Sequence, residues 1–223
     1  MAGRIDRDDR AGLIRFIEQN TKPLRPPLVP EITLHLAEES LPIWQKTEDE
    51  LGVMNVPPPF WAFAWAGGQA MSRYLLDNPD ICRGRSILDL GSGSGISAIA
   101  AAKTGAARIL AADIDALALA ATKLNARANT ISIETTSDDL LTSADWRRME
   151  VVIIGDLFYE RELADRVLAF IAAVKSSGST VLIGDPQRSY FPRDRFERLA
   201  EYQVPVTREL EDAELKRTAV WRA

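Results

Sequence analysis

The chain has 223 residues, of which 46% are hydrophobic and 26% are charged, a composition typical of a globular protein. Its formal net charge of −5 argues against broad nucleic-acid binding, because such binding depends on cations that neutralise phosphates. No apolar run reaches the roughly 18 residues that span a bilayer, so we expect no membrane association. One histidine and one cysteine exclude a zinc site of nitrogen and sulfur ligands, and we expect no metal.

The same features bear on domain count and compartment. The length fits one α/β domain, with residues 1–70 as an N-terminal extension and aromatic segment that leads into a core at 71–223. Cys82 has no disulfide partner in the chain, and the first ten residues lack the apolar stretch of a secretory signal, so we expect a cytoplasmic protein. His35 is interpreted as a polar residue of a short strand rather than as part of a nucleophilic site.

The N-terminal seventy residues combine short elements with prolines. Leu13 to Asn20 is amphipathic, with Leu13, Phe16 and Ile17 on one helical face. Glu31 to Leu36 alternates apolar and polar residues as a strand does. The segment PPPFWAFAW, Pro57 to Trp65, begins with three prolines that forbid a regular helix.

From residue 86 the pattern alternates between strands and helices. The predicted buried strands are Ser86 to Leu90, Arg108 to Ala112, Ile131 to Thr135, Val151 to Gly155 and Thr180 to Gly184. The predicted helices are Ile96 to Lys103, Ala116 to Ala128 with Asp115 as N-cap, and Glu162 to Val174. Tyr202 to Glu209 and Thr218 to Trp221 are predicted to be two strands joined by the turn EDAEL. The predicted fold is a Rossmann-like, mostly parallel α/β sheet of the doubly wound type, with a C-terminal antiparallel hairpin and helices on both faces.

The glycine-rich run LDLGSGSG, Leu88 to Gly95, ends the first of these strands and opens a helix. Glycines there allow a ligand to approach the main chain, in the crevice where open α/β sheets bind nucleotides. Dinucleotide enzymes usually show Gly-x-Gly-x-x-Gly without a preceding acid, whereas here Asp89 precedes a Gly-x-Gly-x-Gly run. This favours S-adenosylmethionine over a nicotinamide cofactor or a purely structural turn.

Acidic residues at the strand ends fit the other parts of that cofactor. Asp89 is expected to face its ammonium group, Asp113 to accept the ribose hydroxyl protons, and Asp138 or Asp139 to meet the adenine amino group. The full predicted set of cofactor-binding residues is Asp89, Gly91, Ser92, Gly93, Gly95, Asp113, Ile114, Asp138, Asp139, Asp156 and Trp65.

The fourth strand ends in GDLFY, Gly155 to Tyr159, where the methyl acceptor must meet the cofactor. Asp156 and Tyr159, with Phe158, are the predicted catalytic residues, and they would bind and orient an acceptor nitrogen. An aromatic, partly dry pocket lowers the pKa of a lysine amine and stabilises cations. Phe60, Trp61 and Trp65 are the predicted pocket residues, although PPPFWAFAW is also typical of a hydrophobic latch over the sheet.

These motifs resemble those of the seven-strand methyltransferases that modify lysine in the β subunit of electron transfer flavoprotein. The matching segments are PPPFWAFAWAGGQA, LDLGSGSG, AADIDALALAA, GDLFY and GDPQRSYFP. The resemblance implies S-adenosylmethionine as cofactor, that flavoprotein subunit as the protein partner, and Asp156 to Tyr159 as part of the catalytic motif. The family also resembles ribosomal-protein methyltransferases, so a ribosomal protein is a second candidate substrate. Two further hypotheses stay open, namely a methyltransferase of a small molecule or nucleic acid and a non-catalytic module that binds the cofactor.

Overall fold

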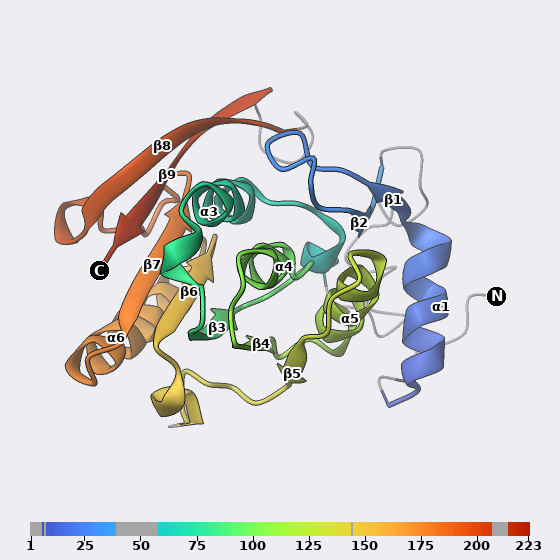
Figure 1. Cartoon of the computed structure of the whole chain (residues 1–223), viewed down its shortest axis with the longest axis horizontal. Helices are drawn as coiled ribbons and strands as arrows, with labels where there is room; N and C mark the ends of the chain where they lie inside the picture. The colour runs from blue at the N-terminus through green and yellow to red at the C-terminus, as the bar shows by residue number, and fades with distance from the viewer. Residues whose placement is uncertain (1–5, 7, 39–57, 144, 207–213) are drawn as a thin grey trace.

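The computed structural model describes residues 6, 8–38, 58–143, 145–206 and 214–223. Within these ranges seven strands form one sheet in the order β5-β4-β3-β6-β7-β9-β8 (Figure 1). The parallel strands are β3 (Ser86–Leu90), β4 (Arg108–Ala112), β5 (Glu134–Thr136), β6 (Val151–Gly155) and β7 (Thr180–Asp185). β8 (Glu197–Pro205) and β9 (Leu215–Arg222) are antiparallel. The predicted fold class is confirmed.

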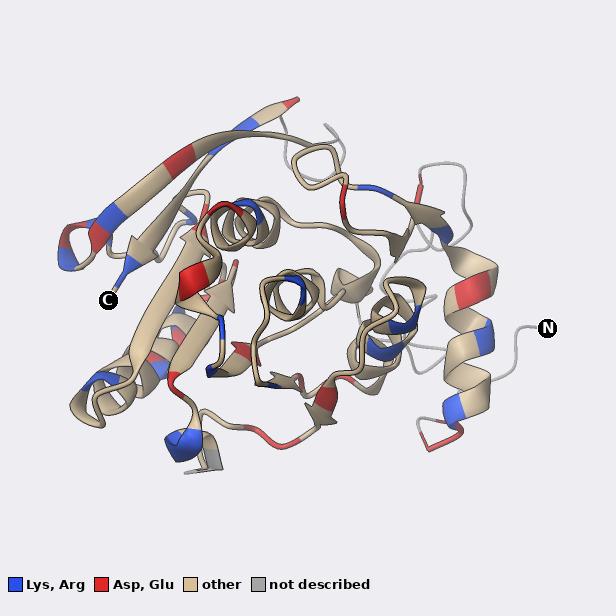
Figure 2. Ribbon diagram, in the orientation of Figure 1, with Lys and Arg blue, Asp and Glu red and all other residues tan. Residues whose placement is uncertain are grey.

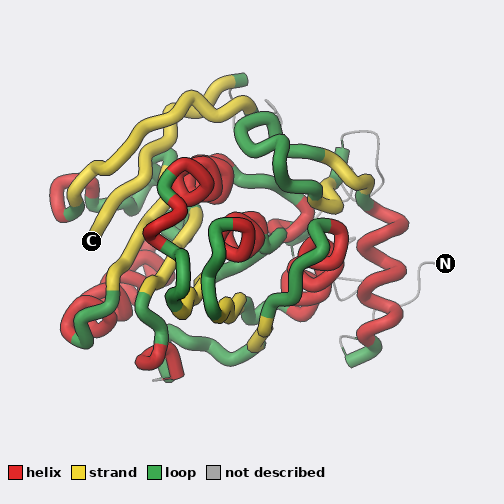
Figure 3. The backbone as a smooth tube through the Cα atoms, in the orientation of Figure 1, coloured by secondary structure: helices red, strands yellow, loops and turns green. Residues whose placement is uncertain are grey.

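Helices cover both faces of this sheet (Figure 3). One face carries α3 (Ala66–Asp77), α4 (Ile96–Lys103) and α5 (Ala116–Ala128), and the other carries α6 (Arg161–Ser176). Successive strand residues point to opposite faces, so Ile87 packs in the cluster under α3 and α4, while Leu88 packs in the cluster under α6. Short 3₁₀ helices lie at Phe60–Ala62 (η1), Pro79–Ile81 (η2), Asp145–Arg148 (η3) and Arg193–Arg195 (η4).

The N-terminal segment packs against the outer side of α5. Helix α1 (Arg10–Asn20) buries Leu13, Phe16 and Ile17 there, as its amphipathic pattern predicts. β1 (Lys22–Leu24) and β2 (Leu34–Leu36) form a separate two-stranded sheet. His35 lies on β2, where its backbone N–H donates to the side-chain oxygen of Asn125 at 2.7 Å. The observed strand β2 begins at Leu34, whereas the sequence predicted a strand from Glu31.

Several local predictions differ from the structure. β2 is shorter than predicted because residues 29–32 form a turn, in which the Ile32 N–H donates to the Val29 carbonyl at 3.0 Å. β5 begins at Glu134, because the Ile131 N–H donates to the Ala126 carbonyl at the end of α5 instead of to a neighbouring strand. Helix α3 was not predicted. It crosses the boundary that the sequence suggested at residue 70, and that division remains a prediction.

The C-terminal hairpin is present, with its first strand earlier than predicted. β8 begins at Glu197 and pairs with β9 along most of its length. Residues 207–209 of the predicted strand, 211–213 of the predicted turn, and Pro57 of the aromatic segment lie outside the described residues. No helix in the described part of the chain is long and apolar enough to cross a membrane.

Charged positions lie mainly on the outer surfaces of the helices and on the β8–β9 hairpin (Figure 2). The central strands β3, β6 and β7 carry few charges, since both faces of these strands are covered. Acidic positions also occur on the loop that leaves β5. That loop lies at the carboxyl edge of the parallel strands, where the fold is expected to bind a ligand.

Candidate functional site

A cavity of about 460 Å³ opens at the carboxyl edge of the parallel strands, within the 300–1,000 Å³ range of small-molecule sites. Its walls come from the glycine loop after β3, the ends of β4 and β6, the loop after β5, the segment before α3, and the loop after β7. The predicted site residues that line it are Phe60, Trp61, Trp65, Gly91, Gly93, Asp113, Ile114, Asp138, Asp139, Asp156 and Tyr159. Asp89, Ser92, Gly95 and Phe158 do not line it.

The glycine loop turns sharply between β3 and α4. Gly91 and Gly93 have φ angles of +69° and +51°, in the left-handed region that favours glycine. A Cβ added at Gly91 would lie 2.8 Å from Leu157, whereas one added at Gly93 would meet nothing within 4 Å and would occupy open space. The loop at Gly93 therefore presents bare backbone toward the cavity, as a bound cofactor requires.

Asp113, at the end of β4, ties that loop to the neighbouring strand. Its Oδ2 accepts the Gly93 N–H at 2.9 Å and its Oδ1 accepts the Asp115 N–H at 3.0 Å. Burial raises the pKa of this carboxyl. Asp115 accepts the Leu117 N–H at 3.0 Å, which confirms its role as the N-cap of α5. Asp113 is thus fixed at the cavity wall beside the loop, a position that suits contact with ribose hydroxyls.

Asp89 lies one layer behind this wall. Its carboxylate is 3% exposed and accepts the Ala98 N–H at 3.0 Å, in the first turn of α4. Burial raises the pKa of Asp89 to about 7, and the charge of Asp113 acts in the same direction. The expected contact with the cofactor ammonium is not supported by this position. Asp89 instead stabilises the start of α4, whose unpaired N–H groups favour a carboxylate.

The loop after β5 borders the end of the cavity where the sequence predicts the adenine to lie. Asp138 accepts the Thr136 hydroxyl at 2.5 Å and is exposed. Asp139 accepts the Leu141 N–H at 3.1 Å and forms an ion pair with Arg166 from α6. Both acids line the cavity, as does Ile114, which is 73% exposed. Contact of Asp138 or Asp139 with an adenine amino group therefore stays a prediction.

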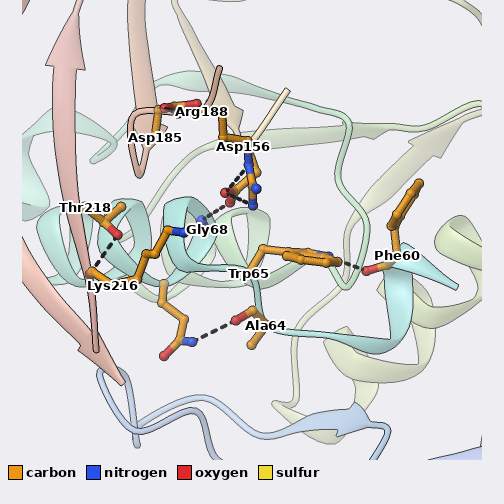
Figure 4. A network of polar contacts seen from close by, with 10 residues as sticks. Phe60, Ala64, Trp65, Gly68, Asp156, Asp185, Arg188, Lys216 and Thr218 are labelled. Carbon is orange, nitrogen blue, oxygen red and sulfur yellow. Dashed lines mark hydrogen bonds and ion pairs between the residues drawn. The ribbon is translucent and has the colours of Figure 1, made fainter. Parts of the chain in front are cut away.

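Asp156 forms the floor of the opposite end. Its φ of +59° turns the chain out of β6 and aims the carboxylate at the first turn of α3, where Oδ2 accepts the Gly68 N–H at 3.0 Å (Figure 4). Its Oδ1 accepts two hydrogen bonds from Arg188, from Nε at 3.1 Å and Nη2 at 2.7 Å. A Cβ added at Gly67 would overlap both Asp156 and the carbonyl oxygen of Gly184. The glycine is required because α3 begins directly against the sheet.

Arg188 is the site residue that sequence reasoning missed. It lies within GDPQRSYFP, one of the segments that resemble the lysine methyltransferase family. The sequence alone assigns no role to any single residue of that segment. The Arg188 N–H donates to Asp185 Oδ1 at 2.8 Å, and its guanidinium lies 5.4 Å from the centre of the Trp65 ring. Burial raises the pKa of Asp185 to about 7, and the charge of Asp156 acts in the same direction.

Aromatic side chains surround the opening beside Asp156. The Phe60 ring lies 5.7 Å from Tyr159 and 6.0 Å from Trp65, and the Trp65 indole N–H donates to the Phe60 carbonyl at 2.8 Å. Burial raises the pKa of the Tyr159 hydroxyl, and the charges of Glu160 and Asp113 add to the effect. Trp61 is buried at the cavity wall.

Phe158 does not belong to this wall. Its side chain is fully buried and packs edge-on against Phe191, with ring centres 5.1 Å apart. The catalytic role predicted for Phe158 is not supported by this position, because successive residues after β6 point in different directions. Tyr159 faces the cavity, whereas Phe158 fills the core beneath α6.

The seven-stranded fold, the bare loop at Gly93 and the carboxylate of Asp113 at the cavity wall define an S-adenosylmethionine-dependent methyltransferase. The family model of ribosomal protein L11 methyltransferase (PrmA) matches residues 69–184. The electron transfer flavoprotein β subunit lysine methyltransferase of Danio rerio is 38% identical over 213 residues, which cover 93% of this chain and 81% of that protein. The corresponding Homo sapiens protein is 38% identical over 212 residues, or 92% and 80% of the two chains.

The chain belongs to the family of electron transfer flavoprotein β subunit lysine methyltransferases. Among solved structures, the ribosomal protein L11 methylase from Lactobacillus delbrueckii subsp. bulgaricus is similar in fold, with a TM-score of 0.51 and 20% identity. That similarity covers 81% of this chain and 92% of the other. The cofactor and the enzyme class expected from the sequence are confirmed.

Proposed function

We propose that the chain transfers a methyl group from S-adenosylmethionine to the side-chain nitrogen of a lysine in the β subunit of electron transfer flavoprotein. The observation that carries this proposal is the division of one cavity into two ends. The glycine loop and Asp113 border one end, and Asp156 with the aromatic residues borders the other. A lysine side chain that enters beside the paired rings of Phe60 and Tyr159 would meet the methyl group over Asp156.

The residues of the acceptor end suit a lysine amine. S-adenosylmethionine supplies a methyl group on a positively charged sulfur when it is bound. The rings of Phe60, Trp65 and Tyr159 present π faces that attract cations and exclude water, and both effects help a lysine to enter and to lose its proton. The Asp156 carboxylate accepts an N–H of the amine and thereby aims the nitrogen lone pair at the methyl carbon.

The length of the similarity favours the flavoprotein subunit as substrate. The relatives named for that activity match 92–93% of this chain, a share too large to leave out the segment before α3. A ribosomal protein is the second candidate, since the family model of ribosomal protein L11 methyltransferase also matches. A relative of that name, from Laribacter hongkongensis, matches 64% of this chain and 47% of its own length at 33% identity. A cytoplasmic location remains a prediction from the sequence.

Incubation with methyl-labelled S-adenosylmethionine and purified, unmethylated flavoprotein tests the proposal. We expect label on lysine of the β subunit, located by mass spectrometry, and a loss of about 10²-fold or more with Asp156→Ala, because the amine is no longer oriented. Asp165→Ala removes an exposed carboxylate of α6 that does not line the cavity, and it should retain full activity. Label on a ribosomal protein instead would support the second candidate, and label in nucleic acid would contradict both.

A further inference from the structure

Arg188 lies at the end of the cavity beside Asp156, where the acceptor would bind. Orientation of the amine by Asp156 does not by itself assign a role to Arg188. Its side chain is 17% exposed and pairs with Asp156, which is 11% exposed. Two guanidinium nitrogens donate to one carboxylate oxygen, while Gly68 at the positive end of α3 donates to the other. The charge of Asp156 is therefore compensated before any acceptor arrives.

Further contacts keep the guanidinium there. The Asp185 carboxylate accepts the Arg188 backbone N–H at 2.8 Å, and the guanidinium stacks over Trp65 (Figure 4). An arginine does not lose its proton in a protein, so its positive charge is permanent. A lysine amine that approaches Asp156 thus meets a fixed cation already bound to the same carboxylate.

Within the described part of the chain, further titratable groups near this point come from three elements. Asp185 ends β7, Tyr159 and Glu160 follow β6, and Asp113 ends β4. The first turn of α3 and the helix η1, which also pack here, contain no charged side chain. Asp185 ionises near pH 7 in this setting, so its negative charge opposes that of Arg188 only toward alkaline pH. Arg188 is a cation in direct contact with Asp156, and its Nη2 donates to Oδ1 at 2.7 Å.

We propose that Arg188 is a specificity-determining residue that makes the site select the neutral lysine amine over the ammonium ion. The proposal rests on lysine as the acceptor. An ammonium at Asp156 would lie close to the guanidinium, and like charges disfavour the charged form. A neutral amine donates one N–H to the carboxylate and keeps its lone pair for the methyl carbon.

The proton balance follows from the same arrangement. The ammonium ion releases one proton to solvent water before transfer. The nitrogen lone pair then forms the new N–C bond while the C–S bond of the methyl donor breaks, and that electron pair stays on sulfur. The secondary ammonium product releases its proton to water after it leaves. A guanidinium acceptor stays charged throughout, so Arg188 also disfavours arginine as a substrate.

The pH dependence of single-turnover methylation tests this role, with saturating S-adenosylmethionine and the flavoprotein acceptor between about pH 6 and about pH 10. In Arg188→Gln the rising limb of the pH–rate profile should shift to higher pH by about one unit. The rate therefore falls about tenfold at neutral pH and recovers at alkaline pH. Arg188→Lys keeps the positive charge and should restore the wild-type midpoint. A uniform loss at every pH in Arg188→Gln would overturn the proposal.

Two matched variants separate this effect from others. Arg161→Gln makes the same change at an exposed arginine that stacks over Tyr190, at 5.2 Å, and it should leave the midpoint unchanged. Asp185→Asn removes a carboxyl group beside Arg188 whose pKa is raised into this range. The limb should persist in that variant, and its disappearance would assign the limb to Asp185 and overturn the proposal.

Folding is checked by thermal unfolding of each variant. If Arg188→Gln does not fold, Asp156→Asn gives a prediction of opposite sign. In that variant the guanidinium acts without the opposing carboxylate, so the midpoint of the pH–rate profile should fall below that of the wild type. A midpoint that stays or rises would overturn the role of Arg188. Absence of lysine methylation by the wild type at any pH would instead overturn the proposed function itself.

Discussion

The two ends of the cavity are built in different ways. The cofactor end comes from two consecutive strand-turn-helix units, in which Asp113 reaches Gly93 only 20 residues away. The acceptor end joins segments that are distant in the sequence, since Asp156 binds Gly68 across 88 residues and Arg188 across 32. One end is therefore specified by local motifs, whereas the other exists only once the sheet has formed.

The largest effect that separates the two ends is expected at Asp113. Asp113→Ala removes the carboxylate beside the glycine loop and should weaken S-adenosylmethionine binding by about 1.5–3 kcal/mol, as for other charge-assisted hydrogen bonds. Titration calorimetry measures this change. The KM for the acceptor protein should stay close to that of the wild type. Asp80→Ala, at an exposed site, is the control, and an unchanged cofactor affinity in folded Asp113→Ala would place the ribose contact elsewhere.

The next largest effect is a pH dependence of stability that arises from Asp89, behind the cofactor end of the cavity. The pKa of Asp89 is 3.8 when unperturbed and about 7 in the folded protein. At pH values between these two, Asp89 holds a proton in the folded state that it has lost in the unfolded state. The stabilisation of the folded protein by this proton is complete below the lower pKa. It is lost as pH rises through the higher one, by up to about 1.4 kcal/mol per pH unit.

Asp89→Asn keeps an oxygen that accepts the Ala98 N–H and removes the ionisation. The free energy of unfolding, measured in urea across this pH range, should therefore fall less steeply with pH than in the wild type. Asp185 titrates in the same range and leaves part of the slope in place. Parallel curves for the two proteins would contradict the assignment.

The smallest effect is expected at the aromatic wall. Phe60→Ala removes ring contacts with Trp65 and Tyr159, and such pairs contribute about 0.5–1.5 kcal/mol each. The KM for the acceptor protein should rise severalfold while cofactor affinity stays constant, the reverse of the pattern for Asp113→Ala. Tyr190→Ala, at an aromatic residue that does not line the cavity, is the control. A loss of cofactor affinity in Phe60→Ala would erase the distinction between the two ends.

The sequence predicted most of the fold because hydrophobic runs and glycine turns are local signals. The bounds of β3, β4, β6, α4 and α5 agree with the prediction. Helix α3 was missed because two glycines lie in its first turn, and glycines weaken helix propensity. Its start is stabilised by Asp156, from a strand that follows 88 residues later, and no local pattern announces such a cap.

The same reasoning explains the outcome at the site. Asp113, Asp156 and the aromatic residues were predicted because they follow strands or form an unusual cluster, and all except Phe158 line the cavity. Asp89 was placed at the cavity by its position in the motif, but strand alternation turns its side chain toward α4. Arg188 lies in a loop among other polar residues, and its importance comes only from the contact with Asp156. Spatial neighbours of that kind are not visible in a single sequence.

The close approach of Gly67 and Gly184 has a consequence for redesign of this enzyme. An added methyl group at either position would overlap the backbone of the other, and at Gly67 it would also overlap Asp156. The half-exposed rings of Phe60 and Tyr159 have no such constraint. Libraries aimed at new acceptor proteins can therefore vary the rim widely, provided that the glycine pair under it is left intact.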